Sequence, residues 1–210
     1  NATARWGLGR ALIKLKQMAK AVPHLEQAVA GLPKAPEPRY DLALACVAVH
    51  RSADAVAQLK IVVARQPQWI EALSLLGYAL HQEGQPAEAE ATLRRALALR
   101  PNHPETLNHL GLVALRVPGR IDEATRHFTQ ALAVQPALIE AWNNLGTALM
   151  KQNRLDEALS AYRRALALDA KFSKCKFNES LVRLLQGRLD REAWLKYEYR
   201  WVVLRESPAR

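Results

Sequence analysis

The sequence predicts an all-α protein built as a stack of similar helical units, because one hydrophobic pattern returns every 34 or 35 residues along most of the chain. In the clearest unit, Ala89, Leu93, Ala96 and Leu97 recur at the spacing of one helix face, which predicts a helix. The same alanine position is filled in five units by Ala21, Ala55, Ala89, Ala124 and Ala158. A leucine or an aromatic residue follows each of these alanines four residues later.

Glycine, proline and turn-forming residues follow the same period. A glycine preceded by leucine marks three successive units, at Gly77, Gly111 and Gly146. A proline closes four units, at Pro33, Pro67, Pro101 and Pro136. Turn formers such as Gly84-Gln85-Pro86 stand between the apolar stretches, where turns belong. Small residues let neighbouring helices approach closely, so the repeated pattern is one of packing.

Together these residues resemble the tetratricopeptide repeat, and the resemblance covers nearly the whole chain. It implies a right-handed superhelical solenoid in which each unit is a pair of antiparallel helices. We therefore expect one solenoid domain over residues 1–210, with about five repeats and a divergent capping repeat at its C-terminal end. The expected repeats, in chain order, are 2–35, 36–69, 70–103, 104–138, 139–172 and the divergent 173–207.

Individual units depart from the pattern in ways that helix pairs tolerate. The first unit begins it, with Gly9 in the glycine position. The fourth unit holds one additional residue at Val117-Pro118, where a loop absorbs it. The fifth ends at Ala170 in place of a proline.

An acidic residue recurs in the first turn of the first helix of four units, at Glu37, Glu71, Glu105 and Glu140. We interpret these carboxylates as charges that stabilise the helix dipole. The alternative is that they form an acidic stripe that binds a basic ligand.

Charge and hydropathy exclude a membrane span. The longest uncharged stretch, near Leu42 to Val49, is far shorter than the roughly 20 apolar residues that cross a bilayer. No secretory signal opens the chain, which favours a cytoplasmic protein, although a start at Asn1 without methionine weakens that inference.

The net charge of +10 is concentrated at the two ends of the chain. Residues 1–35 carry six basic groups and one acid, and residues 171–210 carry ten basic groups and five acids, whereas residues 36–170 carry fourteen of each. A protein that follows a phosphate backbone needs basic residues in successive units. Nucleic acid is therefore an unlikely partner.

The sequence predicts neither catalysis nor a cofactor. The six histidines include no pair at helical spacing, and there is no Cys-x-x-Cys to complete a metal site. Cys46 and Cys175 lie several repeats apart, too far for a disulfide, and Cys46 is expected to act as a small core residue. We expect no enzyme activity, no cofactor and no metal in this chain.

The resemblance places ligand binding on the concave face, which the first helix of each repeat lines. The predicted groove residues are Tyr40, Tyr78, His81, Asn108, His109, Arg116, Asn143, Asn144, Thr147, Lys151 and Asn178. Amide side chains both donate and accept hydrogen bonds, and tyrosines add contact area with few rotors, so the set suits an extended peptide.

Asn144 and Asn178 stand in one repeat position and resemble part of the asparagine ladder of O-linked N-acetylglucosamine transferase. The alternative is that Asn143 and Asn144 are merely solvated. The carboxylate clamp of chaperone-binding members is not reproduced, because Leu44, Tyr78 and Leu112 occupy its rows. If the groove assignment holds, replacing Asn143 and Asn144 with alanine should weaken binding while leaving the melting temperature nearly unchanged.

The end of the sixth unit is rich in aromatic residues. Trp194, Tyr197 and Trp201 are spaced to share one face of a helix, which predicts an aromatic cap over the last apolar surface. The segment from Trp194 to Trp201 also resembles the ending of bacterial repeat arrays that lead into a glycosyltransferase-like domain, with Tyr199 in place of a tryptophan.

Three functions follow as hypotheses. The leading one is a protein-interaction scaffold that binds an extended peptide or a partner helix and performs no chemistry. The first alternative is the recruiting region of a larger bacterial glycosyltransferase whose catalytic domain follows Arg210. The second alternative, nucleic-acid binding through the basic ends, is disfavoured. The terminal repeats are also candidates for self-association, and the first repeat alternatively for packing against further repeats upstream of residue 1, since terminal units normally need a polar outer face.

Overall fold

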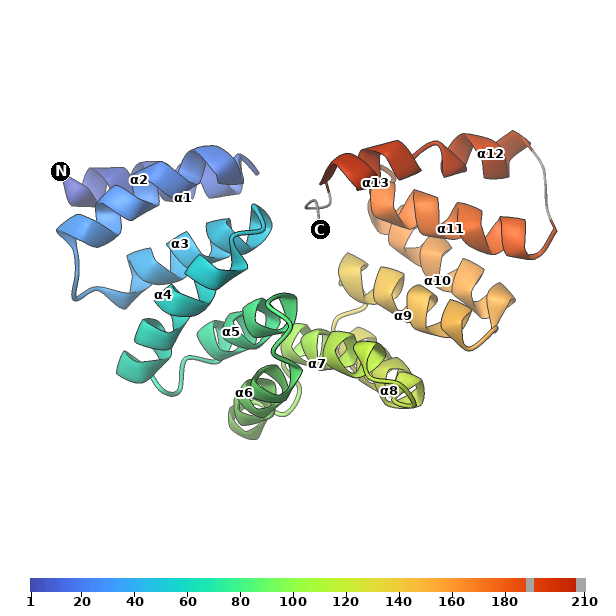
Figure 1. Ribbon diagram of the computed structural model, residues 1–210, viewed down its shortest axis with the longest axis horizontal. Helices are drawn as coiled ribbons and strands as arrows, with labels where there is room; N and C mark the ends of the chain where they lie inside the picture. Colours follow the sequence, from blue (N-terminus) through green and yellow to red (C-terminus); the bar gives the residue numbers. More distant parts are fainter. Residues whose placement is uncertain (188–190, 207–210) are drawn as a thin grey trace. The chain divides into compact units, whose positions relative to one another are not determined.

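The computed structural model describes residues 1–187 and 191–206, and its regular structure within those ranges is helical throughout (Figure 1). The first unit of the chain contains α1 (Ala2–Lys14), α2 (Met18–Gly31), α3 (Pro36–Ala48), α4 (Ser52–Arg65), α5 (Ile70–Gln82) and α6 (Pro86–Leu99). The second contains α7 (Pro104–Arg116), α8 (Ile121–Val134), α9 (Ile139–Lys151), α10 (Leu155–Leu168), α11 (Ser173–Leu185), α12 (Arg191–Tyr197) and α13 (Arg200–Glu206). Consecutive helices pack as pairs, which confirms the predicted all-α fold of stacked helix pairs.

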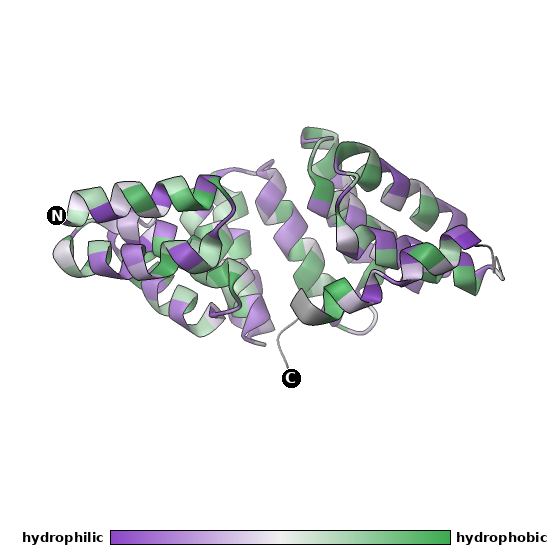
Figure 2. Ribbon diagram, turned by 90° about the horizontal axis from the view of Figure 1, so that it is seen from above, coloured by the Kyte–Doolittle hydropathy of each residue, from purple (hydrophilic) through white to green (hydrophobic). Residues whose placement is uncertain are grey.

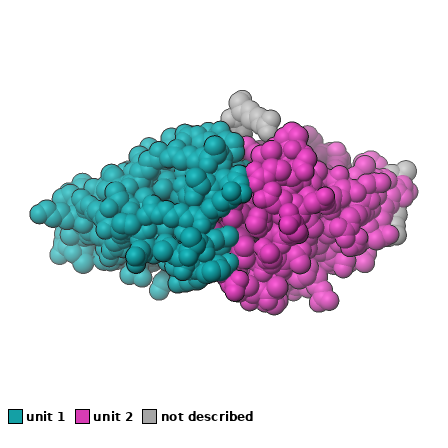
Figure 3. All heavy atoms as spheres, turned by 90° about the horizontal axis from the view of Figure 1, so that it is seen from below, with its two compact units in different colours: residues 1–101 teal, residues 102–210 magenta. Residues whose placement is uncertain are grey.

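The chain divides into two compact units, residues Asn1–Pro101 and Asn102–Arg210, which Figure 3 colours separately. Each unit has its own buried apolar rows, and Figure 2 shows hydrophobic and hydrophilic residues interleaved along the helices. The single solenoid domain over the whole chain stays a prediction. No helix among the described residues is long and apolar enough to cross a membrane.

Helix ends follow from local chemistry. Proline occupies the first turn of α3, α6 and α7, where its missing N–H costs no hydrogen bond. The predicted acidic row does lie in first turns, with Glu71 in α5 and Glu140 in α9 as examples. Gly84 follows α5 with a φ of +74°, and His50 and Asn153 hold the same turn position with φ of 61° and 59°. The turn between the two helices of a repeat therefore demands a left-handed residue whether or not glycine supplies it.

Four repeats close by packing a large side chain of the second helix on a glycine of the first helix, at Gly9, Gly77, Gly111 and Gly146. A Cβ built on Gly146 would lie 2.6 Å from Cε1 of Tyr162, and one built on Gly111 would collide with Phe128. Tyr162 and Phe128 are fully buried by this contact. The recurring glycines are thus required by close helix approach, as the sequence predicted.

Both cysteines are free and buried, which confirms the prediction that Cys46 is a core residue. Cys46 lies in the core of the first unit and Cys175 in that of the second. Burial raises the pKa of Cys46 to about 11 and that of Cys175 to about 12, so both are thiols at neutral pH. The Sγ of Cys175 donates to the backbone oxygen of Tyr162 at 3.3 Å.

The end of the sixth repeat differs from the predicted aromatic cap. Helix α12 ends at Tyr197 and α13 begins at Arg200, so Trp194 and Trp201 do not share a helix face. Both tryptophans are about half exposed. Tyr197 lies between Phe177 and Trp194, with centroid distances of 5.9 Å to each. Gly187 holds the left-handed turn position that Asn153 fills in the preceding repeat, with a φ of +73°.

The physical reason for this difference is a set of charges on α11. Glu179 occupies the position that Leu110 and Leu145 fill in the two preceding repeats, and it is buried. Its Oε2 accepts a hydrogen bond of 2.7 Å from Lys196 of α12. Ion pairs therefore join α12 to α11 in addition to the ring contact between Tyr197 and Phe177.

Candidate functional site

The predicted groove residues fall in the first helices of both units. Tyr40, Tyr78 and His81 belong to the first unit, on α3 and α5. The other eight lie on α7, α9 and α11 of the second unit. The contacts that join several of them are found in the second unit.

A chain of hydrogen bonds connects four asparagines of α7, α9 and α11, which we call the amide row: Asn108, Asn143, Asn144 and Asn178. The Nδ2 of Asn178 donates to Oδ1 of Asn143 at 3.0 Å. The Nδ2 of Asn143 donates to Oδ1 of Asn144 at 3.3 Å, and the Nδ2 of Asn144 donates to Oδ1 of Asn108 at 3.0 Å. Three successive repeats are thereby linked through their first helices.

Burial divides the amide row into two kinds of residue. Asn108 and Asn143 expose only 5% and 2% of their accessible area, whereas Asn144 and Asn178 are partly exposed. The expectation that all four line a surface is therefore corrected for Asn108 and Asn143. Adjacent helix residues point about 100° apart, so Asn143 turns inward and Asn144 outward. The buried Asn108 and Asn143 accept hydrogen bonds from Asn144 and Asn178 and so orient these two exposed side chains.

Asn144 and Asn178 have the capacity to bind a ligand. An amide carries two N–H hydrogens and an oxygen with two lone pairs. Each of these residues uses one N–H on the asparagine of the preceding repeat, so a second N–H remains to donate. The neighbouring repeat also fixes the orientation of the amide. Such preset groups match the N–H and C=O groups of an extended peptide backbone without requiring a particular sequence.

The remaining predicted residues of the second unit frame this row. Thr147 Oγ1 donates to the backbone oxygen of Asn143 at 3.0 Å and lies 3.2 Å from the hydroxyl of Tyr162, so it is held against the helix. Arg116 and Lys151 are exposed at the ends of α7 and α9, and His109 is partly exposed. Two cations thus stand at one end of the helices that carry the amides.

In the first unit, aromatic and polar side chains join neighbouring repeats. Tyr40 stacks on Trp69 with a centroid distance of 4.6 Å, and Trp6 Nε1 donates to Asp41 Oδ2 at 2.6 Å. Burial raises the pKa of Asp41, whereas the hydrogen bond from Trp6 and the charge of Arg10 lower it by less. His81 is buried and Tyr78 is partly buried.

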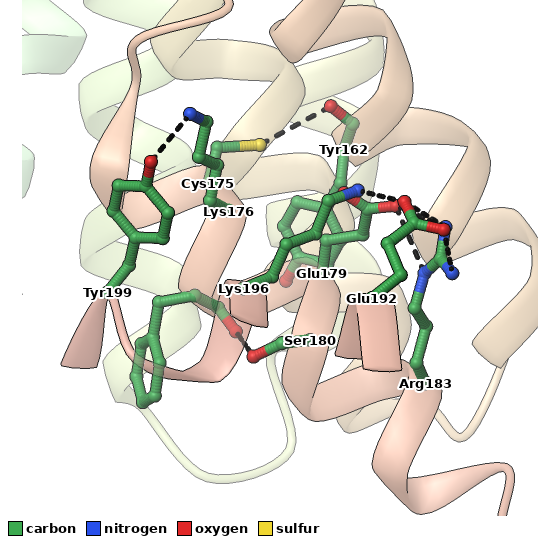
Figure 4. Close-up of polar contacts among 10 residues, drawn as sticks. Tyr162, Cys175, Lys176, Glu179, Ser180, Arg183, Glu192, Lys196 and Tyr199 are labelled. Carbon is green, nitrogen blue, oxygen red and sulfur yellow. Dashed lines mark hydrogen bonds and ion pairs between the residues drawn. The ribbon is translucent and has the colours of Figure 1, made fainter. Parts of the chain in front are cut away.

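Figure 4 shows the charged contacts that sequence reasoning missed in the sixth repeat. Arg183 donates to Glu179 at 3.1 Å and to Glu192 at 2.9 Å, while Lys196 donates to Glu179 at 2.7 Å and lies 2.8 Å from Glu192. We call these four residues the charge ring. One signal was available in the sequence, since Glu179 interrupts a row of leucines.

No group of three or more His, Cys, Asp or Glu residues within 1–187 and 191–206 is placed to hold a metal ion. His103, the most buried histidine, caps α7 through Thr106 and lies 3.4 Å from Glu105.

Comparison with curated proteins gives short matches to repeat-containing proteins. A peroxisomal targeting signal receptor of Eremothecium gossypii is 40% identical over 57 residues, 27% of this chain and 10% of the receptor. The chloroplastic tetratricopeptide repeat domain-containing protein PYG7 of Arabidopsis thaliana is 37% identical over 62 residues, 30% of this chain and 20% of that protein. The matches span only a small part of the length of these relatives.

Solved structures share the fold over most of the chain. A thermophilic tetratricopeptide repeat protein of Thermus thermophilus is 26% identical, with a TM-score of 0.76 over 88% of this chain and all of that one. The Cut9 and Hcn1 hetero-tetramer contains a chain that matches with a TM-score of 0.83 at 20% identity, over 100% of this chain and 41% of that one.

Three family models described as tetratricopeptide repeat match residues 12–79, 70–137 and 139–172. These ranges contain the glycines, alanines and prolines from which the resemblance was drawn. The chain therefore belongs to the tetratricopeptide repeat family.

Proposed function

We propose that the second unit binds an extended peptide segment of a partner protein along the amide row and performs no catalysis of its own. The observation that carries this proposal is the bracing of Asn144 and Asn178 by buried asparagines of the preceding repeats. An exposed amide that is merely solvated needs no such partner. Fixing its orientation lowers the entropy lost when a ligand binds.

The family supports the general role. Tetratricopeptide repeats form protein-interaction scaffolds, and some of the matched relatives are named as receptors for a targeting signal. Arg116 and Lys151, exposed on the same first helices, favour a peptide with acidic residues at that end. The resemblance of the segment from Trp194 to Trp201 to arrays that precede a glycosyltransferase-like domain stays a prediction.

A peptide array tests the proposal. The purified protein and an Asn144→Ala/Asn178→Ala variant are applied to the same immobilised short peptides of varied sequence. We expect the protein to retain a set of extended peptides and the variant to lose most of that set, with an unchanged circular dichroism spectrum. A Ser160→Ala variant, altered at an exposed residue of α10, serves as the matched control. Equal retention by the double variant would reject the amide row as the site.

A further inference from the structure

Charged side chains flank the amide row on both sides in α7 and α9. In α9, Glu140 lies four residues before Asn144 and Lys151 lies seven residues after it, so the three residues share one helix face. Helix α7 repeats this order with Glu105 and Arg116. We call Glu105 and Glu140 the acidic rim, and Arg116 and Lys151 the basic rim.

The charges of both rims are accessible to a ligand. Glu140, Arg116 and Lys151 are exposed, and none of them forms an ion pair within the part of the chain that the structure describes. Glu105 lies 3.4 Å from His103 and is partly exposed. At a rise of about 1.5 Å per residue, Glu140 and Lys151 stand about 16 Å apart along α9, which is too far for them to pair with each other.

The amide row stands between the two rims. Helix α9 contacts both α7 and α11, so the row crosses adjacent helices and does not run along one of them. Along the helix, Glu140 lies about 6 Å and Lys151 about 10 Å from Asn144. Because each ion pair would combine two long, flexible side chains, a peptide held at Asn144 can reach both rims.

An extended peptide presents its side chains alternately to the two rims. Successive residues of a strand point to opposite sides, and the chain rises about 3.3 Å per residue. First helices that pack about 8–10 Å apart are therefore spanned by about three residues each. The acidic rim ends after α9, because Lys174 of α11 takes the position of Glu140. The rims of α7 and α9 thus extend over about six peptide residues.

We propose that the amide row selects an extended segment of a partner protein in which basic and acidic residues alternate over about six positions, a selectivity that rests on the proposed function of this site as a peptide-binding row. Basic side chains of the segment lie toward the acidic rim, and acidic side chains lie toward the basic rim. Alternation also places like charges four residues apart, which destabilises a helix and keeps the unbound segment extended.

Three labelled ten-residue peptides test this selectivity by fluorescence anisotropy at low ionic strength. One alternates lysine and glutamate, the second has the same composition in two blocks, and the third alternates serine and glutamine. The alternating charged peptide should bind the full chain about fivefold to tenfold more tightly than either of the others. Absence of that preference would overturn the charge selectivity. Equal binding of all three peptides that Asn144→Ala/Asn178→Ala abolishes would do so while leaving the peptide-binding row itself intact.

Exchange of the rim charges separates contact with the rims from an effect of net charge. Glu140→Lys/Lys151→Glu keeps the net charge but reverses the rims on α9 alone, so it should remove the preference. Adding Glu105→Lys/Arg116→Glu should restore it, because a peptide of alternating charge that shifts by one residue presents every side chain to the other rim. A preference that survives the exchange on α9, or that the fourfold variant does not regain, would also overturn the proposal.

The matched control exchanges a charge pair outside the rims. Arg154 and Glu157 form an exposed ion pair of 2.6 Å at the start of α10, the second helix of the same repeat. Arg154→Glu/Glu157→Arg likewise keeps the net charge, and it should bind the three peptides as the unaltered protein does. A loss of preference in this control equal to that caused by the exchange on α9 would show that the rims are not the contact.

Discussion

Asn178 donates an amide hydrogen bond of 3.0 Å to Asn143, which is buried in the preceding repeat. The two residues are 35 positions apart and occupy different rows of the repeat, one facing inward and the other outward. Packing and recognition therefore share one hydrogen-bonded chain. A substitution in the inner row will act on stability and binding together, whereas one in the outer row will act on binding.

The first prediction separates these rows. Asn143→Ala removes a buried amide and leaves the N–H of Asn178 and the oxygen of Asn144 without their partner, which costs about 1–3 kcal/mol. Asn144 is partly exposed, so Asn144→Ala should change the free energy of unfolding by about 0.5 kcal/mol or less. Urea unfolding of both variants measures the difference. Equal losses would contradict the division. Because Asn143 is buried, we now expect the double replacement to lower the melting temperature.

The second prediction concerns the glycine position. Gly146→Ala places a methyl group 2.6 Å from the buried ring of Tyr162, and overpacking of this kind costs about 1–3 kcal/mol. Gly7→Ala is the control, since a Cβ there meets nothing within 4 Å and alanine favours the helix by about 0.5–1 kcal/mol. Thermal unfolding should therefore shift in opposite directions for the two variants. A shift of the same sign for both would disprove the packing argument.

The charge ring leads to the third prediction. Glu179→Gln takes the carboxylate charge from the buried centre of the ring and leaves Arg183 and Lys196 with the exposed Glu192 as their remaining carboxylate, which costs about 3 kcal/mol. Glu192→Gln alters an exposed member and should cost about 0–1 kcal/mol. Hydrogen exchange of the α11 and α12 amides locates the loss in the sixth repeat. Comparable exchange in both variants would show that burial of Glu179 does not matter.

The fourth prediction is a pH dependence. Arg120 donates two hydrogen bonds to Glu123, of 2.7 and 2.8 Å, and lowers the pKa of that carboxyl from its ordinary value of 4.5 to about 2. A folded pKa below the unfolded one stabilises the protein above the unfolded pKa. That stabilisation is lost as the pH falls from about 4.5 to about 2.

The prediction is tested by comparing the urea unfolding of Arg120→Gln with that of the unaltered protein at several pH values. The difference in urea midpoint should be largest near neutral pH and should shrink as the pH falls through 4.5 towards about 2. Glu157, whose pKa is lowered by its hydrogen bonds from Arg154, titrates in both proteins and cancels in the difference. A difference that stays constant over this range would show that the ion pair acts without titrating.

The period of the sequence was sufficient to predict the helix pairs, the close contact at Gly146 and the burial of Cys46. Those features repeat, and each copy supports the others. The orientation of the two neighbouring asparagines was not predictable from the period, because Asn143 and Asn144 differ by one residue and their burial depends on how the flanking repeats are packed. The charge ring was hidden for a different reason. Lys196 and Glu179 stand where the preceding repeat has Tyr162 and Leu145, so the period predicts apolar residues at both positions and not an ion pair.

The exchange of leucine for Glu179 also limits how the chain can be rearranged. Interior repeats present an apolar row to the helix before them, so a 34-residue segment is a module that can be duplicated or deleted without changing the chemistry of its junctions. Residues 173–206 are not interchangeable in this way. Transplanted without α12, α11 would keep Arg183 but lose Lys196 as a partner of the buried Glu179, so the two helices can be moved only together.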